Sequence, residues 1–227
     1  MKTGKKTVIF CDFDGTITLS DNIVAIMKEF KPEGYEAIMK RTVNQEISLR
    51  EGVGAMFALL PSGKKEEIVN FVVGRAGIRE GFREFLGYVK QEGIEFYVTS
   101  GGMDFFIDPL LAPFDIPSGH IFCNSANFSG DRIEILWPHP CQEPCNNGCG
   151  MCKTTVMRRF PEDRYERILI GDSLTDFEGA KIADLVYSRS ILTDKCAELG
   201  VKHVPFQDFF EIMNDMRQKR QQGGGNI

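Results

Sequence analysis

The sequence of 227 residues lacks several features that would mark particular classes of protein. No apolar run approaches the ~20 residues that a membrane-spanning helix needs. A basic surplus is also missing, since the net charge is −5, and this argues against a nucleic-acid-binding protein. The apolar run near the N-terminus ends at Asp12 and is too short for a signal peptide, so we expect a cytoplasmic protein.

Histidine is scarce, whereas cysteine is not. The three histidines are scattered, and none is predicted to bind a metal: His120, His139 and His203. The seven cysteines are expected to stay reduced in the cytoplasm. Three of them are predicted to be core residues: Cys11, Cys123 and Cys196. The other four lie close together in one segment.

The order of apolar and helical segments predicts an α/β fold with no internal repeat. Strands are expected over 8–12, 94–99, 121–123, 167–171, 185–187 and 201–204, with a hairpin over 127–138. Because helices alternate with these strands, we predict a Rossmann-like three-layer sandwich around a parallel sheet. Residues 20–75 read instead as helices, which predicts a helical cap inserted after the first strand. The core domain would then span 1–19 and 76–220, with a disordered Gly-rich tail over 221–227.

Two carboxylates stand at the end of the first predicted strand, in the string Cys11-Asp12-Phe13-Asp14-Gly15-Thr16-Ile17-Thr18. Alternate residues of an extended chain point the same way, so Asp12 and Asp14 are expected on one side. Two close carboxylates repel each other unless a cation or a proton lies between them. The hypothesis is that they hold Mg²⁺ and that one attacks phosphorus to give an aspartyl phosphate. A solvated Asp-x-Asp turn is the alternative.

Two further stretches carry groups suited to binding phosphate. In Val98-Thr99-Ser100-Gly101-Gly102, a strand ends at a hydroxyl and two glycines. Ser100 can donate to a phosphate oxygen, and the amides of Gly101 and Gly102 would open a helix, where anions are favoured. Lys153 begins another predicted helix, and its ammonium would neutralise a phosphate and a nucleophilic carboxylate. The alternatives are an ordinary strand-to-helix turn and a solvated surface lysine.

A second pair of acids follows the strand Ile168-Leu169-Ile170-Gly171. Asp172 would complete a shell of hard oxygen ligands for Mg²⁺. Asp176 would bind a metal-bound water or orient Lys153. Its alternative role is that of a carboxylate in the first turn of a helix, where the helix dipole favours it.

The order Asp-x-Asp-Gly-Thr, Ser-Gly-Gly, Lys and Gly-Asp-Ser-x-x-Asp resembles the haloacid dehalogenase superfamily of phosphohydrolases over nearly the whole chain. The resemblance implies that Asp12 is the nucleophile and that Asp14 is the general acid and base. It also implies phosphate binding by Ser100, Gly101 and Lys153. The implied magnesium ligands are the Asp12 carboxylate, the Asp14 main-chain carbonyl and Asp172, with Asp176 as the supporting acid.

The helical insert resembles the cap of the phosphoserine phosphatase branch of that superfamily. The first motif, together with Glu51-Gly52-Val53-Gly54, Met103-Asp104-Phe105-Phe106 and Trp137-Pro138-His139, resembles one family, the 2-hydroxy-3-keto-5-methylthiopentenyl-1-phosphate phosphatases of methionine salvage. This resemblance implies a small phosphorylated enol that bears a thioether. Met56 and Phe57 would suit the thioether, and ordinary helix packing is the alternative for both.

Other functions on the same scaffold stay open at this point. One is hydrolysis of phosphoserine or of a phosphorylated amino alcohol; a phospho-amino acid would need a clamp such as Arg41 and Arg50 with Glu46 or Glu51. A phosphomutase and a catalytically silent binding protein are the others. The expected partner is a small phosphorylated metabolite, without nucleic acid or membrane. The oligomeric state, monomer or homodimer, is left open.

The remaining cysteines form the pattern Cys141-x3-Cys145-x3-Cys149-x2-Cys152. Four thiols within twelve residues can reach one tetrahedral Zn²⁺, although the spacing differs from that of a zinc finger. A structural zinc site is therefore one hypothesis. Disulfides and a reduced loop that packs beside Lys153 are the alternatives.

Overall fold

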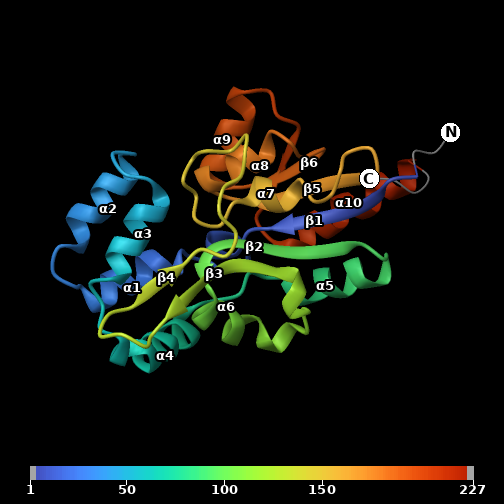
Figure 1. Cartoon of the computed structure of the whole chain (residues 1–227). Coiled ribbons are helices and arrows are strands. Elements are labelled where there is room, and N and C mark those ends of the chain that lie inside the picture. The colour runs from blue at the N-terminus through green and yellow to red at the C-terminus, as the bar shows by residue number, and fades with distance from the viewer. Residues whose placement is uncertain (1–3, 224–227) are drawn as a thin grey trace.

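The computed structural model describes residues 4–223 and contains one seven-stranded sheet (Figure 1). The strand order is β4-β3-β2-β1-β5-β6-β7, and every neighbouring pair is parallel except β3 and β4. The strands are β1 (Lys6–Cys11), β2 (Glu95–Met103), β3 (Ile121–Asn127), β4 (Glu134–Leu136), β5 (Tyr165–Gly171), β6 (Leu185–Ser188) and β7 (His203–Pro205). The predicted parallel α/β sheet and its hairpin excursion are confirmed.

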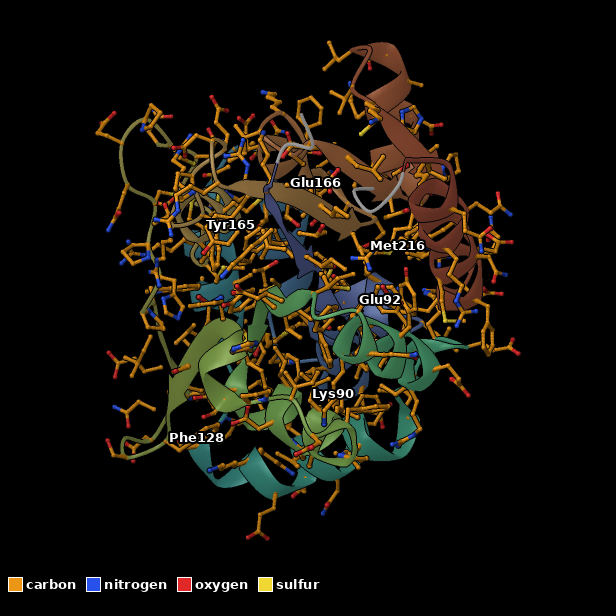
Figure 2. The ribbon with its side chains drawn as sticks, turned by 90° about the vertical axis from the view of Figure 1, so that its right-hand side faces the viewer. Lys90, Glu92, Phe128, Tyr165, Glu166 and Met216 are labelled. Atoms are coloured by element: carbon orange, nitrogen blue, oxygen red, sulfur yellow. The ribbon has the colours of Figure 1, made fainter. Side chains whose placement is uncertain are left out.

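Helices cover both faces of the sheet. Alternate side chains of the central strand β1 point to opposite faces and are buried against these helices. Ile9 and Cys11 pack with one set of helices: α5 (Phe82–Gln91), α6 (Asp104–Leu111) and α10 (Phe209–Gly223). Val8 and Phe10 pack with the other: α7 (Lys153–Met157), α8 (Phe177–Ala180) and α9 (Ser190–Glu198). Figure 2 shows Glu92, at the end of α5, on the same side as Met216 of α10. The three-layer arrangement is that predicted.

The segment between β1 and α5 contains four α-helices and no strand, as predicted: α1 (Asn22–Phe30), α2 (Tyr35–Val43), α3 (Leu49–Phe57) and α4 (Lys65–Arg75). Asp21 caps α1 by accepting a hydrogen bond from the Val24 amide. Ser48 and Glu51 form a capping box at the start of α3. The four helices gather beyond the carboxyl end of β1 (Figure 1). This position suits the proposed division into a cap of 20–75 and a core of 1–19 and 76–220.

Two predicted boundaries differ from the structure. The helix expected to open at Gly101 and Gly102 begins at Asp104, because β2 continues through both glycines with a shift of register between Thr99 and Met103. The tail over 221–227 was expected to be disordered, but α10 extends through Gly223, so that prediction is wrong for 221–223. Residues 224–227 lie outside the described range. Within 4–223, no helix combines the length and apolar character needed to cross a bilayer.

Candidate active site

Asp12 leaves the carboxyl end of the central strand and enters a tight turn over 13–17. Asp12 as a whole residue is 4% exposed. The turn requires a glycine, since Gly15 has a φ of +86° and a β-carbon there would lie 2.5 Å from a carboxylate oxygen of Asp172. The Thr16 hydroxyl in the same turn also contacts Asp172, donating to its Oδ1 at 3.0 Å. The turn after β1 therefore packs directly against Asp172, which follows the neighbouring strand β5.

A buried arginine stabilises this turn by donating hydrogen bonds to its carbonyl groups. Arg79, between α4 and α5, is 7% exposed and donates to the carbonyls of Gly15, Thr16, Thr18 and Gln207. An unpaired buried carbonyl costs about 1–3 kcal/mol, so this one side chain contributes strongly to the shape of the turn. Arg79 was not predicted as a site residue, and no motif in its neighbourhood signals the role.

Lys153 lies between two acids rather than on the surface. Its side chain is 4% exposed, and its Nζ donates to Oδ1 of Asp12 at 2.5 Å and to Oδ1 of Asp176. Burial lowers the pKa of Lys153, but the two carboxylates outweigh burial and hold the pKa above its ordinary value. Lys153 is thus a fixed cation beside Asp12, and the alternative of a solvated surface lysine is excluded.

Asp172 and Asp176 complete an acidic cluster with Asp12. Single carboxylate oxygens of the three lie within 4.8 Å of one another. Asp176 is fully buried; besides Lys153, it accepts hydrogen bonds from the amides of Asp172 and Ser173. Burial, and then the charge of Asp176, raises the pKa of Asp172. Burial likewise raises the pKa of Asp12, against the opposing effect of Lys153. Three acids thus share this site with a single lysine.

Asp14 faces a different set of partners. Its Oδ1 accepts from the amide nitrogen of Asn22 at 3.1 Å and from Asn22 Nδ2 at 2.7 Å, while Ser100 Oγ donates to Oδ2 at 3.3 Å. Burial, and then the charge of Asp21, raises the pKa of Asp14 to about 7, although these donors oppose the rise. Asp14 can therefore change protonation near neutral pH. Asn22 was not predicted as a site residue.

Ser100 and the glycines after it reach Asp14 from β2. Ser100 is fully buried, and its Oγ accepts from the Gly102 amide at 2.9 Å. A β-carbon on Gly102 would lie 2.7 Å from Asp14 Oδ2, so only glycine allows this approach. Gly102 acts here through its small size at a bulged strand end, not through a helix N-terminus as predicted.

A cavity of about 270 Å³ opens over these groups, between the ends of β1, β2 and β5 and residues of α1 and α3. Its polar wall includes Asp12, Asp14, Gly101, Gly102, Asp172 and Arg189. Its apolar wall consists of Leu19, Ile23, Leu49 and Val53. The structure thus brings together every predicted core residue of the site: Asp12, Asp14, Ser100, Gly101, Lys153, Asp172 and Asp176.

The predicted cap contacts do not line this cavity. Met56 is 4% exposed and Phe57 is fully buried, and both belong to the hydrophobic core. The Phe57 ring packs edge-on against Phe105, with ring centroids 6.2 Å apart. Of the same helix α3, Leu49 and Val53 face the cavity instead. The arginines considered as a clamp lie elsewhere: Arg41 pairs with Glu46, and Arg50 stacks over Trp137.

Comparisons with known proteins agree with this geometry. Residues 9–181 match the haloacid dehalogenase-like hydrolase family. A 2-hydroxy-3-keto-5-methylthiopentenyl-1-phosphate phosphatase of Brevibacillus brevis is 52% identical over 218 residues, covering 96% of this chain and 98% of the relative. The phosphatase of the same name from Geobacillus thermodenitrificans is 47% identical, covering 94% of this chain and 96% of the relative.

Solved structures share the fold at low sequence identity. A phosphoserine phosphatase, solved as a phospho-aspartyl intermediate analogue, superposes with a TM-score of 0.65 at 20% identity, covering 92% of this chain and 98% of the other. A phosphoserine phosphohydrolase-like protein of Francisella tularensis gives 0.63 at 22% identity, covering 88% and 94%. The chain therefore belongs to the haloacid dehalogenase-like hydrolases, and within them to the family of 2-hydroxy-3-keto-5-methylthiopentenyl-1-phosphate phosphatases, as its motifs predict.

Proposed function

We propose that this protein hydrolyses 2-hydroxy-3-keto-5-methylthiopentenyl-1-phosphate in methionine salvage, with Mg²⁺, through an aspartyl phosphate on Asp12. One observation carries the proposal. Asp12, which is paired with Lys153, and Asp14 both line a cavity whose wall on the proposed cap side is aliphatic. A phosphoryl group needs the polar wall, and a methylthio tail needs the apolar wall. Two relatives that carry this activity in their names are 52% and 47% identical in sequence.

The acidic cluster fits a magnesium ion. Three carboxylates lie together and two of them pair with one ammonium, so a divalent cation would neutralise the excess charge, and all the donors are the hard oxygens that Mg²⁺ prefers. Asp12 and Asp172 would hold the ion, together with the Asp14 carbonyl. Asp176 supports the site in another way, because its oxygens already accept from Lys153 and two amides. Bound Mg²⁺ would neutralise charge on the transferring phosphoryl group.

The residues of the chain divide the reaction between them. An oxygen of Asp12 attacks phosphorus while Lys153 neutralises negative charge beside it. Asp14, protonated, donates its proton to the leaving enol oxygen, and then, as a carboxylate, removes a proton from the water that attacks the aspartyl phosphate. Asn22 and Ser100 fix the orientation of Asp14. The pKa of Asp14, about 7, suits a group that must both give and take a proton.

Two neighbouring substitutions should shift the pH profile in opposite directions. Asn22→Ala removes a donor that stabilises the Asp14 carboxylate, so the pKa of Asp14 should rise and the alkaline limb of kcat/KM should move to higher pH. Asp21→Asn removes a like charge and keeps a side-chain oxygen for capping α1, so the limb should move to lower pH. Both profiles are measured at saturating Mg²⁺. Shifts of the same sign would contradict the role given to Asp14.

A substrate panel tests the proposed function directly. Phosphate release is measured with Mg²⁺ on freshly generated 2-hydroxy-3-keto-5-methylthiopentenyl-1-phosphate, phosphoserine and phosphoethanolamine at equal concentrations. We expect a preference of at least tenfold for the enol phosphate, about 1.4 kcal/mol at the transition state. Equal rates, or a preference for an amino phosphate, would retain the phosphatase chemistry and overturn the assigned substrate.

The apolar wall is tested by a polar substitution at Leu49. Leu49→Asn should lower kcat/KM for the thioether substrate by roughly tenfold, because burying a methylthio group against an amide is unfavourable. Activity on phosphoethanolamine, which has no apolar tail, should change little. Val43→Asn is the matched control, since Val43 lies on α2 of the same cap and is exposed. An equal loss on both substrates would assign Leu49 to cap packing instead.

The cytoplasm is the compartment that we assign to this enzyme. The chain carries seven free cysteines, among them the fully buried Cys11 and Cys196. Thiols in this number persist in a reducing compartment.

A further inference from the structure

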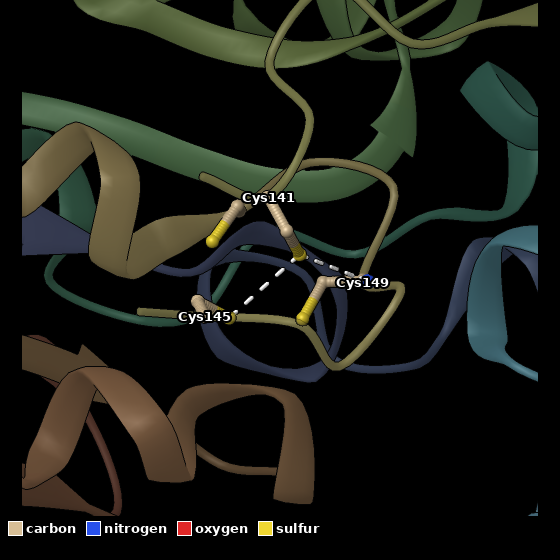
Figure 3. A group of neighbouring side chains, drawn as sticks. Cys141, Cys145 and Cys149 are labelled. Atoms are coloured by element: carbon tan, nitrogen blue, oxygen red, sulfur yellow. Dashed lines mark hydrogen bonds between the residues drawn. The ribbon is translucent and has the colours of Figure 1, made fainter. Parts of the chain in front are cut away.

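The four clustered cysteines are not needed for the phosphatase chemistry, yet the fold brings them together. They lie in the segment between β4 and α7, and their sulfur atoms are all within 4.8 Å of one another. In Figure 3 the side chains of Cys141, Cys145 and Cys149 point toward a common centre. Cys152 completes the group at the start of α7. The folded conformation of this loop, and not only the spacing of the cysteines in the sequence, brings the four sulfur atoms together.

The separations suit a metal better than disulfides. The sulfurs of Cys141 and Cys145 are 3.7 Å apart, whereas a disulfide bond measures about 2.05 Å. Four sulfurs placed about 2.3 Å from a zinc ion at the corners of a tetrahedron are about 3.8 Å from one another. All four cysteines are free thiols. The observed cluster is therefore close to the size of an S₄ zinc site.

Hydrogen bonds to the sulfur atoms also fit a thiolate site. The Cys149 amide donates to the Cys141 sulfur at 3.4 Å, and the Thr154 hydroxyl lies 3.1 Å from the Cys152 sulfur. Such donors reduce the charge on coordinated thiolates and fix their orientation. Four soft thiolates that can bind one ion at the corners of a tetrahedron favour zinc over the other common divalent ions. An iron–sulfur site is the main alternative for such a ligand set.

The loop connects the cluster to both halves of the active site. Cys152 directly precedes Lys153, the cation beside Asp12. On the opposite side, the carbonyl of Gly148 accepts from the Arg50 amide in the first turn of α3, at 3.0 Å. The same helix carries Leu49, which lines the cavity. A fixed loop would thus hold the lysine on the core side and the start of α3 on the cap side.

We propose that Cys141, Cys145, Cys149 and Cys152 bind one structural Zn²⁺, which fixes the loop that positions Lys153 and the first turn of α3. The zinc is bound by the four thiolates and releases their protons to solvent, with no change of oxidation state. It takes no part in the hydrolysis. Metal binding stands independently of the proposed function, and only the kinetic consequence rests on it.

Metal content tests the site itself. Protein purified without chelator should contain about one zinc ion per chain, and Cys145→Ser should lose most of it. Cys145→His keeps a zinc ligand and should retain the metal. Cys196→Ala, which removes a buried cysteine away from the cluster, is the matched control. Protein loaded with Co²⁺ in place of zinc should show the absorption bands of tetrahedral thiolate coordination. Zinc-free, cobalt-silent protein, bound iron, or disulfides found by mass spectrometry would overturn the proposal.

Kinetics test the effect on Lys153. With saturating Mg²⁺, Cys145→Ser should lower kcat roughly tenfold, and Cys145→His should recover most of the loss. The concentration of Mg²⁺ that gives half-maximal activity should stay unchanged, because Asp12 and Asp172 are intact. Far-UV circular dichroism identifies any variant that fails to fold, and the zinc and cobalt measurements on the unsubstituted protein then decide the proposal. If the unsubstituted protein binds zinc and the zinc-depleted Cys145→Ser variant keeps full activity, the positioning role is removed and the site is purely structural.

Discussion

Asp12→Asn is expected to abolish phosphate release. The amide has nearly the size of the carboxylate but cannot attack phosphorus, and it removes one of the carboxylates assigned to Mg²⁺. Loss of a nucleophile typically lowers kcat by a factor on the order of 10⁴ or more. The fold should survive, because Lys153 keeps its ion pair with Asp176. The measurement is phosphate release with Mg²⁺ at high enzyme concentration, beside thermal unfolding of the same sample.

The control for this substitution is Asp163→Asn, which makes the same chemical change at an exposed position. It should leave both activity and unfolding temperature unchanged. Beryllofluoride with Mg²⁺, which mimics an aspartyl phosphate, should protect the native enzyme against heat and fail to protect the Asp12 variant. Full activity in Asp12→Asn would refute the assignment of the nucleophile.

Lys153→Met should have the second large effect, on stability and activity together. The substitution leaves Asp12 and Asp176 buried without their cation. Breaking a buried ion pair by removing one partner costs about 3–5 kcal/mol. Loss of a positive charge beside the transferring phosphoryl group should lower kcat by roughly 10²–10³-fold. The measurements are urea unfolding without Mg²⁺ and phosphate release with it.

The pH dependence of this loss has a definite sign. Burial already raises the pKa of Asp12 in the folded protein, and removing the opposing charge of Lys153 raises it further. The folded state then binds more protons than the unfolded state, so raising the pH destabilises it. The stability difference between the native protein and Lys153→Met should therefore be larger at about pH 7 than at about pH 5. A difference independent of pH would contradict the ion-pair account.

The matched control is Lys181→Met. Lys181 pairs with Glu178 one helical turn away, but both side chains are at least 40% exposed. An exposed pair of this kind contributes less than about 1 kcal/mol, because water and salt screen it. Equal losses at the two positions would show that the buried setting of Lys153 has no special effect.

The sequence alone determined the fold class and the main groups of the site. Alternating apolar strands and helices predict the parallel sheet, and Asp12 and Asp172 directly follow two of its strands, β1 and β5. Parallel neighbours bring their carboxyl ends to one edge, so residues 160 positions apart in sequence meet there. The caps of α1 and α3 at Asp21 and Ser48 are also local features, because capping depends on residues within one turn.

Only the tertiary structure decided which side chains support and enclose the site. Arg79 and Asn22 act through contacts with the turn after β1, and no local pattern records where a buried guanidinium or an amide will point. Along α3, apolar periodicity marks Val53 and Phe57 alike, yet Val53 faces the cavity while Phe57 packs against Phe105. That choice depends on how α3 packs against elements distant in sequence. Periodicity shows that a residue is buried, whereas packing between distant elements decides what it is buried against.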